Sequence, residues 1–117
     1  MSIDLVLADP YPVMLEGLSH VFNDLPDFSV KSCVRNGDDA LKALQQYQPD
    51  ILVMDLSLTQ RSGLSLLEEI KTQNLNTKPV IFTGAPIGEV MRSLDLGVAG
   101  LVSKEKSKHV LVRCIKA

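Results

Sequence analysis

The sequence predicts an α/β domain in which a parallel sheet carries helices on both faces. Short apolar runs alternate with amphipathic helical patterns five times along the chain. This alternation is typical of parallel strands joined by crossover helices. Several of the runs are continuously apolar, as expected for strands buried on both faces. The 117 residues are enough for one domain with a buried core, so residues 1–117 are expected to form a single unit.

The first three elements follow from an apolar run, a helical spacing and a second run. A strand is expected at Ile3–Ala8. A helix should follow over Pro12–Asn23, where apolar residues recur at helical spacing, at Met14, Leu18, Val21 and Phe22. The second strand is expected at Phe28–Val34, although its alternation of apolar and polar residues is less regular.

The middle of the chain predicts a helix, a buried strand and another helix. The turn at Arg35–Asp38 opens a helix that ends near Pro49, because the residue before a proline disfavours helical geometry. That helix places three apolar residues for burial, namely Ala40, Leu41 and Leu44. The run Ile51–Met54 is a fully apolar strand. The helix Gly63–Gln73 has an apolar stripe made of Leu64, Leu67 and Ile70, with Leu66 beside it.

The last four elements repeat the same alternation. A strand is expected at Pro79–Thr83 and a short helix at Ile87–Leu96, which ends at Gly97, a residue suited to the position after a helix. The fifth strand is expected at Gly100–Ser103. The last helix, Lys108–Lys116, can bury Val110, Leu111, Cys114 and Ile115.

Composition narrows the classes of function. The formal net charge is −2, so this domain has no basic excess with which to bind nucleic acid directly. No apolar run is long enough to span a membrane, and the N-terminus has no signal-peptide pattern. Only Cys33 and Cys114 are cysteines, which favours a reducing cytoplasm, and both are expected to be buried or half-buried thiols. His20 and His109 have no partner at metal-site spacing and are expected on helix surfaces.

Four polar residues follow four of the predicted strands, one at each strand end: Asp9, Asp55, Thr83 and Lys104. Ligands of open parallel sheets bind beyond the carboxyl ends of the strands, so these side chains should share one edge. Each residue taken alone also has an ordinary interpretation: a helix cap, a strand end, a common strand residue and a solvated lysine. The four together are far more specific than any one of them.

This set has the parts of a phosphoryl-transfer site. Two carboxylates bind Mg²⁺ well, together with water and phosphate oxygens. A carboxylate can also attack phosphorus and become an aspartyl phosphate. The charge that grows on the phosphoryl oxygens needs a cation and a hydrogen-bond donor, which Lys104 and Thr83 would supply.

Over nearly its whole length, the sequence resembles the response-regulator receiver domains of two-component signalling. Asp55 ends the third strand, where that family has its phosphoacceptor, and the following Leu56-Ser57-Leu58 with Gly63 fits the family's loop. Thr83 and Lys104 match the hydroxyl residue and the lysine that end strands four and five. The segment Asp9–Leu18 resembles the NarL/FixJ branch, whose members carry a LuxR-type DNA-binding domain. The resemblance implies a flavodoxin-like (CheY-like) three-layer sandwich with strand order 2-1-3-4-5.

The resemblance also implies function and partners. A sensor histidine kinase would transfer a phosphoryl group to Asp55, with Thr83 and Lys104 assisting. Mg²⁺ would be held by Asp9, Asp55 and the backbone carbonyl of Ser57. The protein would be a cytoplasmic signalling phosphoprotein rather than an enzyme. Its output would be transcription regulation, through a C-terminal LuxR-type helix-turn-helix domain if the chain belongs to a longer regulator, and a homodimer is also open.

Several residues depart from the family's pattern. Pro10 replaces the second acid after strand one, which usually contacts Mg²⁺ directly, so about tenfold to several-hundredfold weaker Mg²⁺ binding is expected. Thr59 replaces a frequent proline, which predicts a more mobile loop. Leu101 replaces an aromatic switch residue, which predicts a muted output switch. Ser57 and Ala85 occupy positions that tune phosphoryl lifetime in the family.

The departure at Pro10 keeps one alternative open, an atypical receiver that works as an interaction module without phosphorylation. Enzyme and electron-carrier alternatives are less well supported. No Gly-x-Gly-x-x-Gly motif or Walker-type loop follows a strand. A dehalogenase-like phosphatase needs a second acid two residues after Asp55, where Ser57 stands. A flavin carrier usually stacks its cofactor on aromatic residues, and these make up only 4% of this chain.

Overall fold

Five strands alternate with five helices in the computed structural model, which describes residues 2–84, 87–105 and 108–116. The strands are β1 (Ile3–Ala8), β2 (Phe28–Val34), β3 (Ile51–Met54), β4 (Lys78–Thr83) and β5 (Gly100–Ser103). The helices are α1 (Pro12–Asn23), α2 (Gly37–Tyr47), α3 (Gly63–Thr72), α4 (Ile87–Asp95) and α5 (Lys108–Lys116). The predicted ranges are confirmed to within one residue, except that α2 ends at Tyr47, two residues before the expected limit near Pro49. For example, α3 ends one residue earlier than expected because Gln73 is its C-cap.

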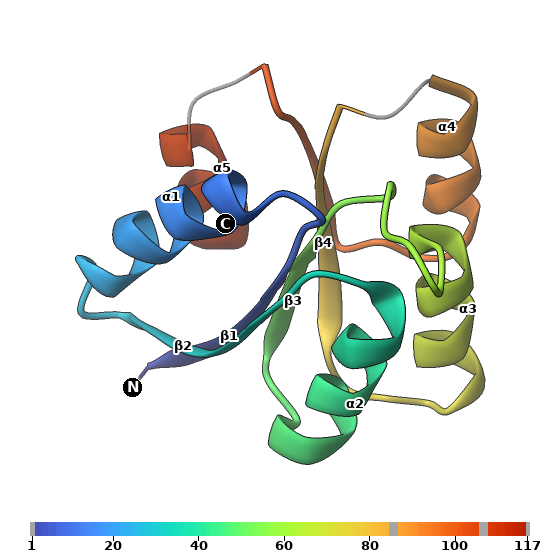
Figure 1. Cartoon of the computed structure of the whole chain (residues 1–117), viewed down its shortest axis with the longest axis horizontal. Coiled ribbons are helices and arrows are strands. Elements are labelled where there is room, and N and C mark those ends of the chain that lie inside the picture. Colours follow the sequence, from blue (N-terminus) through green and yellow to red (C-terminus); the bar gives the residue numbers. More distant parts are fainter. Residues whose placement is uncertain (1, 85–86, 106–107, 117) are drawn as a thin grey trace.

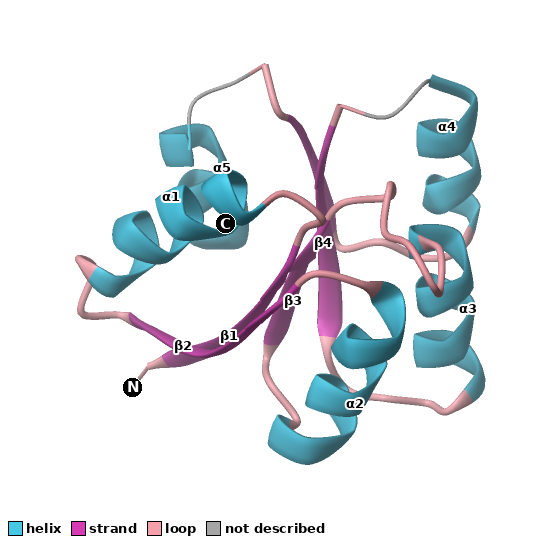
Figure 2. Ribbon diagram, viewed as in Figure 1, coloured by secondary structure: helices cyan, strands magenta, loops and turns pink. Residues whose placement is uncertain are grey.

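The strands form one parallel sheet in the order β2-β1-β3-β4-β5, which confirms the predicted topology. Helices α1 and α5 lie on one face of the sheet, and α2, α3 and α4 lie on the other (Figures 1 and 2). The molecule is therefore a three-layer sandwich. Because all five strands run in the same direction, their carboxyl ends share one edge of the sheet.

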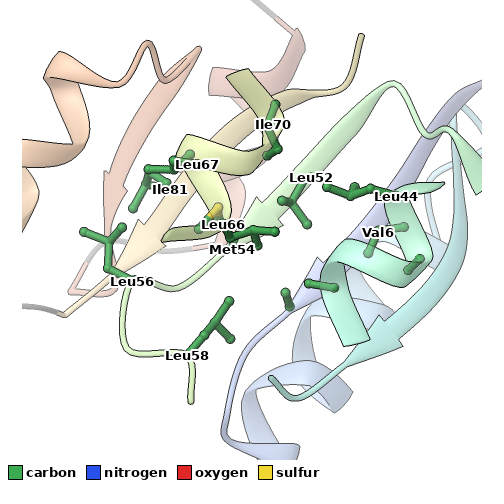
Figure 3. Close-up of a cluster of buried hydrophobic side chains, with 13 residues drawn as sticks. Val6, Leu44, Leu52, Met54, Leu56, Leu58, Leu66, Leu67, Ile70 and Ile81 are labelled. Carbon is green, nitrogen blue, oxygen red and sulfur yellow. The ribbon is translucent and has the colours of Figure 1, made fainter. Parts of the chain in front are cut away.

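Each face of the sheet has its own apolar core, since successive strand residues point to opposite faces. In β1, Leu5 and Leu7 pack toward α1 and α5, whereas Val6 and Ala8 pack toward α2 and α3. Figure 3 shows the second of these cores, where side chains of α2 and α3 meet those of β1, β3 and β4. Its buried members are Val6, Ala8, Ala40, Ala43, Leu44, Leu52, Met54, Leu56, Leu58, Leu66, Leu67, Ile70 and Ile81.

The loop between β3 and α3 is held in place by buried side chains and by close backbone contacts. Leu56 and Leu58 are buried in the core of Figure 3. Gly63 lies so close to this loop that an added Cβ would be 2.5 Å from Cα of Leu56. Gly37 makes a similar approach, and its added Cβ would lie 1.9 Å from the carbonyl oxygen of Arg61. The backbone that follows Asp55 is therefore held against α2 and α3.

Three expectations about single residues and spans can be compared with the structure. Cys33 is exposed, so the expectation that both cysteines are at least half-buried is wrong for it, whereas Cys114 is half-buried. Cys33 lies on the edge strand β2, where its exposed side chain alternates with half-buried neighbours. His20 and His109 are exposed on α1 and α5, as predicted. Among the described residues, no helix combines the length and apolarity that crossing a bilayer needs.

Candidate functional site

The four polar residues predicted from the strand ends lie together at the carboxyl edge of the sheet. Asp9 follows β1, Asp55 follows β3, Thr83 ends β4 and Lys104 follows β5. Backbone hydrogen bonds continue the strand pairing past the strand ends: the N–H of Asp55 donates to the carbonyl of Ala8 at 3.1 Å, and the N–H of Lys104 donates to that of Thr83 at 3.0 Å. The sheet itself therefore sets the relative positions of these four residues.

The Lys104 ammonium bridges the two carboxylates. Its Nζ lies 2.7 Å from Oδ2 of Asp9 and also contacts Oδ2 of Asp55. Asp9 and Asp55 are only 1% and 2% exposed, and the side chain of Lys104 is 14% exposed. Two buried negative charges thus share one nearly buried positive charge, an arrangement in which each charge depends on its partners.

The other oxygen of Asp55 accepts two hydrogen bonds. The hydroxyl of Thr83 donates to Oδ1 at 2.7 Å, and the backbone N–H of Ser57 donates to the same atom at 2.9 Å. Asp9 is held in a comparable way, since the N–H of Tyr11 donates to its Oδ1 at 2.9 Å. Both carboxylates are therefore fixed in orientation before any ligand arrives.

These contacts shift the pKa of two groups. Burial raises the pKa of Asp55, but the hydrogen bonds from Lys104, Thr83 and Ser57 outweigh burial and hold it below the ordinary value. Burial lowers the pKa of Lys104, but its hydrogen bonds to Asp55 and Asp9 outweigh burial and raise it. Asp55 is thus an ionised carboxylate at neutral pH, as a nucleophile must be, and Lys104 is a full cation.

The donor set suits a hard divalent cation only in part. Two adjacent carboxylates match the preference of Mg²⁺ for one or two carboxylates plus water. However, Pro10 offers no carboxylate, and its carbonyl accepts a long hydrogen bond, 3.5 Å, from Nη2 of Arg35. Within the described ranges, no three His, Cys, Asp or Glu side chains are grouped to hold a metal ion. The residues therefore fit a two-carboxylate site, from which a cation must partly displace the ammonium of Lys104.

The positions that depart from the family's pattern lie around this cluster. Leu101 lies on β5, and a hollow of about 340 Å³ beside it is also lined by Thr83 and Val90. Thr59 is exposed in the loop after β3, and its carbonyl accepts the N–H of Gly37 at 3.0 Å. Ala85 lies outside the described residues. These placements leave the expected effects on switching, loop mobility and phosphoryl lifetime as predictions.

Sequence reasoning missed one side chain at the site, Tyr11. Its ring lies over the ammonium of Lys104, with Nζ 5.4 Å from the ring centroid. The signal was present as an aromatic residue between two prolines, two positions after the aspartate that follows β1. No rule of spacing connects that residue to a lysine near the other end of the sequence, because the contact depends on the conformation of the loop.

The family described as "response regulator receiver domain" matches residues 5–116, which is nearly the whole chain. The chain belongs to this family. It is the receiver domain of a two-component response regulator, and the curated and structural relatives below place it with the NarL/LuxR type.

Three curated relatives illustrate this type. The chain is 30% identical over 117 residues to YxjL of Bacillus subtilis, named an uncharacterized transcriptional regulatory protein; the match covers 99% of this chain and 54% of YxjL. It is 27% identical over 117 residues to the response regulator VraR of Staphylococcus saprophyticus, covering 99% and 56%. It is 23% identical over 112 residues to the nitrate/nitrite response regulator NarL of Escherichia coli, covering 95% and 52%. The chain thus spans about half the length of these relatives.

Solved structures share the fold. A LuxR-family DNA-binding response regulator from Staphylococcus aureus superposes with a TM-score of 0.93 at 27% identity, covering 97% of this chain and 96% of that one. The isolated receiver domain of RcsB from Salmonella enterica, solved with a phosphomimetic, gives a TM-score of 0.89 at 20% identity, covering 100% and 88%. The second likeness concerns the fold alone.

Proposed function

We propose that this receiver domain accepts a phosphoryl group on Asp55 from a sensor histidine kinase and thereby regulates an output module. The observation that carries this proposal is the cluster around Asp55, in which an ionised, buried carboxylate is held by a cation, a hydroxyl and a backbone N–H. These groups are the ones that a carboxylate nucleophile and a developing phosphoryl charge require.

The reaction uses Asp55 as the nucleophile. A carboxylate oxygen of Asp55 attacks the phosphorus of a phosphohistidine, the P–N bond breaks, and the kinase imidazole leaves. The product is a mixed carboxylic–phosphoric anhydride on Asp55. Lys104 then turns from the carboxylate toward a phosphoryl oxygen, and the hydroxyl of Thr83 donates to another. Both groups already contact Asp55 and need only short movements.

Mg²⁺ belongs to the same proposal, since receiver domains generally use it for phosphorylation. When bound, it neutralises charge on the phosphoryl oxygens. Asp9, Asp55 and the carbonyl of Ser57 would hold it. Because Pro10 brings no acid and Lys104 already bridges the carboxylates, we expect the affinity to be low. Mg²⁺ titrated in the presence of a beryllofluoride phosphoryl mimic and followed by amide NMR should shift the resonances around Asp55.

Intact-mass analysis tests the phosphorylation itself. After incubation with acetyl phosphate and Mg²⁺, the wild-type domain should gain one phosphoryl group. The Asp55→Asn variant should gain none, whereas Asp50→Asn, which removes an exposed aspartate at the opposite end of β3, should behave like wild type. Unmodified wild-type protein at saturating donor would refute the proposal.

One observation favours a second function, an interaction module that acts without phosphorylation. Lys104 already forms ion pairs with both carboxylates, and Pro10 stands where an acid would help a metal compete with it. Such a module would have the same affinity for its partner whether or not acetyl phosphate and Mg²⁺ are present. A phosphorylation-dependent change in affinity would exclude it.

The remaining parts of the proposal concern the whole regulator. A C-terminal LuxR-type helix-turn-helix domain would supply DNA binding, in keeping with relatives that are about twice as long as this chain. The receiver itself would signal rather than catalyse turnover. It would act in the cytoplasm, and the proposal includes a homodimer as one form of the phosphorylated regulator.

A further inference from the structure

Two prolines restrict the backbone where the chain passes from β1 into α1, and an aromatic ring between them reaches the site. The sequence there is Pro10-Tyr11-Pro12, of which Pro12 is the first residue of α1. Each proline ring fixes its own φ, and a residue that precedes proline is restricted to extended conformations. Tyr11 obeys this restriction, with φ −101° and ψ 116°, and it is the N-cap of α1.

Backbone hydrogen bonds fix this segment further. The N–H of Tyr11 donates to Oδ1 of Asp9 at 2.9 Å. The carbonyl of Tyr11 accepts the N–H groups of Met14 and Leu15 at 3.1 and 3.2 Å. The backbone of Tyr11 is therefore held by the same residue, Asp9, that binds the Lys104 ammonium.

The ring of Tyr11 is 62% exposed, yet one face lies over Nζ of Lys104, 5.4 Å from the centroid. An ammonium within about 6 Å of an aromatic face is attracted by the ring quadrupole. Among the described residues, the Lys104 ammonium thus has three partners: the carboxylates of Asp9 and Asp55 and the Tyr11 ring. Because the backbone of this segment is already ordered, little backbone entropy opposes the ring contact.

We propose that Tyr11 is a positioning residue for Lys104, whose ring holds the ammonium in its bridging place between the two aspartates. The effect of this contact on Mg²⁺ binding rests on the proposed function, but the contact itself does not depend on phosphorylation. The proposal also assigns a role to Pro10. In place of a metal-binding acid, it restricts the backbone of the segment that holds the Tyr11 ring over the Lys104 ammonium. The bridging lysine competes with Mg²⁺ for the carboxylates, so the ring weakens Mg²⁺ binding.

Two substitutions separate the ring from the bulk of the side chain. Tyr11→Phe keeps the ring and removes the hydroxyl, whereas Tyr11→Leu keeps apolar bulk and removes the ring. An exposed cation–π contact corresponds to a factor of about two to five in an equilibrium constant. We therefore expect Tyr11→Leu to bind Mg²⁺ about two- to fivefold more tightly than wild type, and Tyr11→Phe to match wild type. A merely structural role for Tyr11 would instead weaken Mg²⁺ binding.

Carbon–proton NMR of the lysine ε-methylene groups tests the contact without metal or phosphoryl donor. Ring current should shift the Lys104 signal upfield in wild type and Tyr11→Phe, and the shift should disappear in Tyr11→Leu. Lys116, whose Nζ lies 5.7 Å from the Phe28 centroid, is an internal control that should keep its shift in every variant. An unchanged Lys104 signal in Tyr11→Leu would overturn the proposal, even if Asp55 is phosphorylated normally. A lost shift in a domain that never takes up phosphate would support the contact and count against the proposed function alone.

Discussion

Replacing Lys104 with methionine should destabilise the domain strongly, because it leaves two buried carboxylates facing each other. Both Asp9 and Asp55 contact the same Nζ. Two oxygens that share one ammonium at hydrogen-bond distance are at most about 5 Å apart. Two unit charges at that distance repel by about 3 kcal/mol at an effective dielectric of about 20. In other proteins, removing one partner from a buried ionic cluster lowers the free energy of unfolding by about 3–5 kcal/mol. We expect a loss of about 3 kcal/mol from a domain whose total stability is about 5–15 kcal/mol.

Urea unfolding at pH 7.5, followed by circular dichroism, measures this loss. With a urea slope of about 1.5 kcal/mol per molar, the midpoint should fall by about 2 M. The matched control is Lys116→Met, which breaks the exposed Lys116–Asp27 pair, where the nitrogen–oxygen distance is 2.9 Å and the side chains are 44% and 59% exposed. Exposed pairs contribute about 1 kcal/mol or less.

The pH dependence of the Lys104→Met loss distinguishes charge repulsion from lost packing. Without the ammonium, burial and mutual repulsion raise the pKa of one carboxylate above its unfolded value, so the folded variant takes up a proton as the pH falls. The difference between wild type and Lys104→Met in the free energy of unfolding should therefore become smaller as the pH falls from 7.5 to 5. A difference no larger than that of Lys116→Met, or one independent of pH, would refute the reasoning.

Three further changes test other parts of the account. Thr83→Val removes the hydroxyl that donates to Asp55 at 2.7 Å, and urea unfolding should show a loss of about 1.5–3 kcal/mol that Thr83→Ser does not share. Gly37→Ala should lose about 1–3 kcal/mol because its Cβ would lie 1.9 Å from the carbonyl oxygen of Arg61, whereas Gly88→Ala, whose Cβ meets no described atom within 4 Å, should gain up to about 1 kcal/mol. The pKa of Asp55 is lower in the folded than in the unfolded state, so its ionised form stabilises the fold above the unfolded pKa, and this stabilisation disappears as the pH falls through the folded pKa. Asp55→Asn should therefore weaken the fall in the free energy of unfolding at acidic pH. An unchanged fall would contradict the direction of the pKa shift.

The layout of the site was predictable because it depends on few choices. Apolar runs locate the strands, parallel strands share one carboxyl edge, and the residue after each run must lie at that edge. Asp9, Asp55, Thr83 and Lys104 were identified in this way, and the structure brings all four together. Their roles in phosphoryl transfer remain predictions.

Contacts that depend on loop conformation, and side-chain exposure on the edge strand of the sheet, could not be predicted. The ring of Tyr11 reaches Lys104 only because the backbone after β1 takes one particular path. Cys33 was misjudged because β2 is an edge strand, and because the register between β1 and β2 shifts between Leu5 and Val6. The sequence pattern shows that successive side chains of a strand point to opposite faces of the sheet. For an edge strand it does not show which of the two sets of side chains is exposed to solvent.

The most direct test of the central claim is to locate the phosphoryl group chemically. An acyl phosphate is reduced by borohydride to an alcohol, so a phosphorylated aspartate becomes homoserine and can be identified by tandem mass spectrometry of peptides. After treatment with acetyl phosphate and Mg²⁺, we predict homoserine at position 55 and unmodified aspartate at position 9. Homoserine at another position, or none at any aspartate under conditions that label a known receiver domain, would contradict the account.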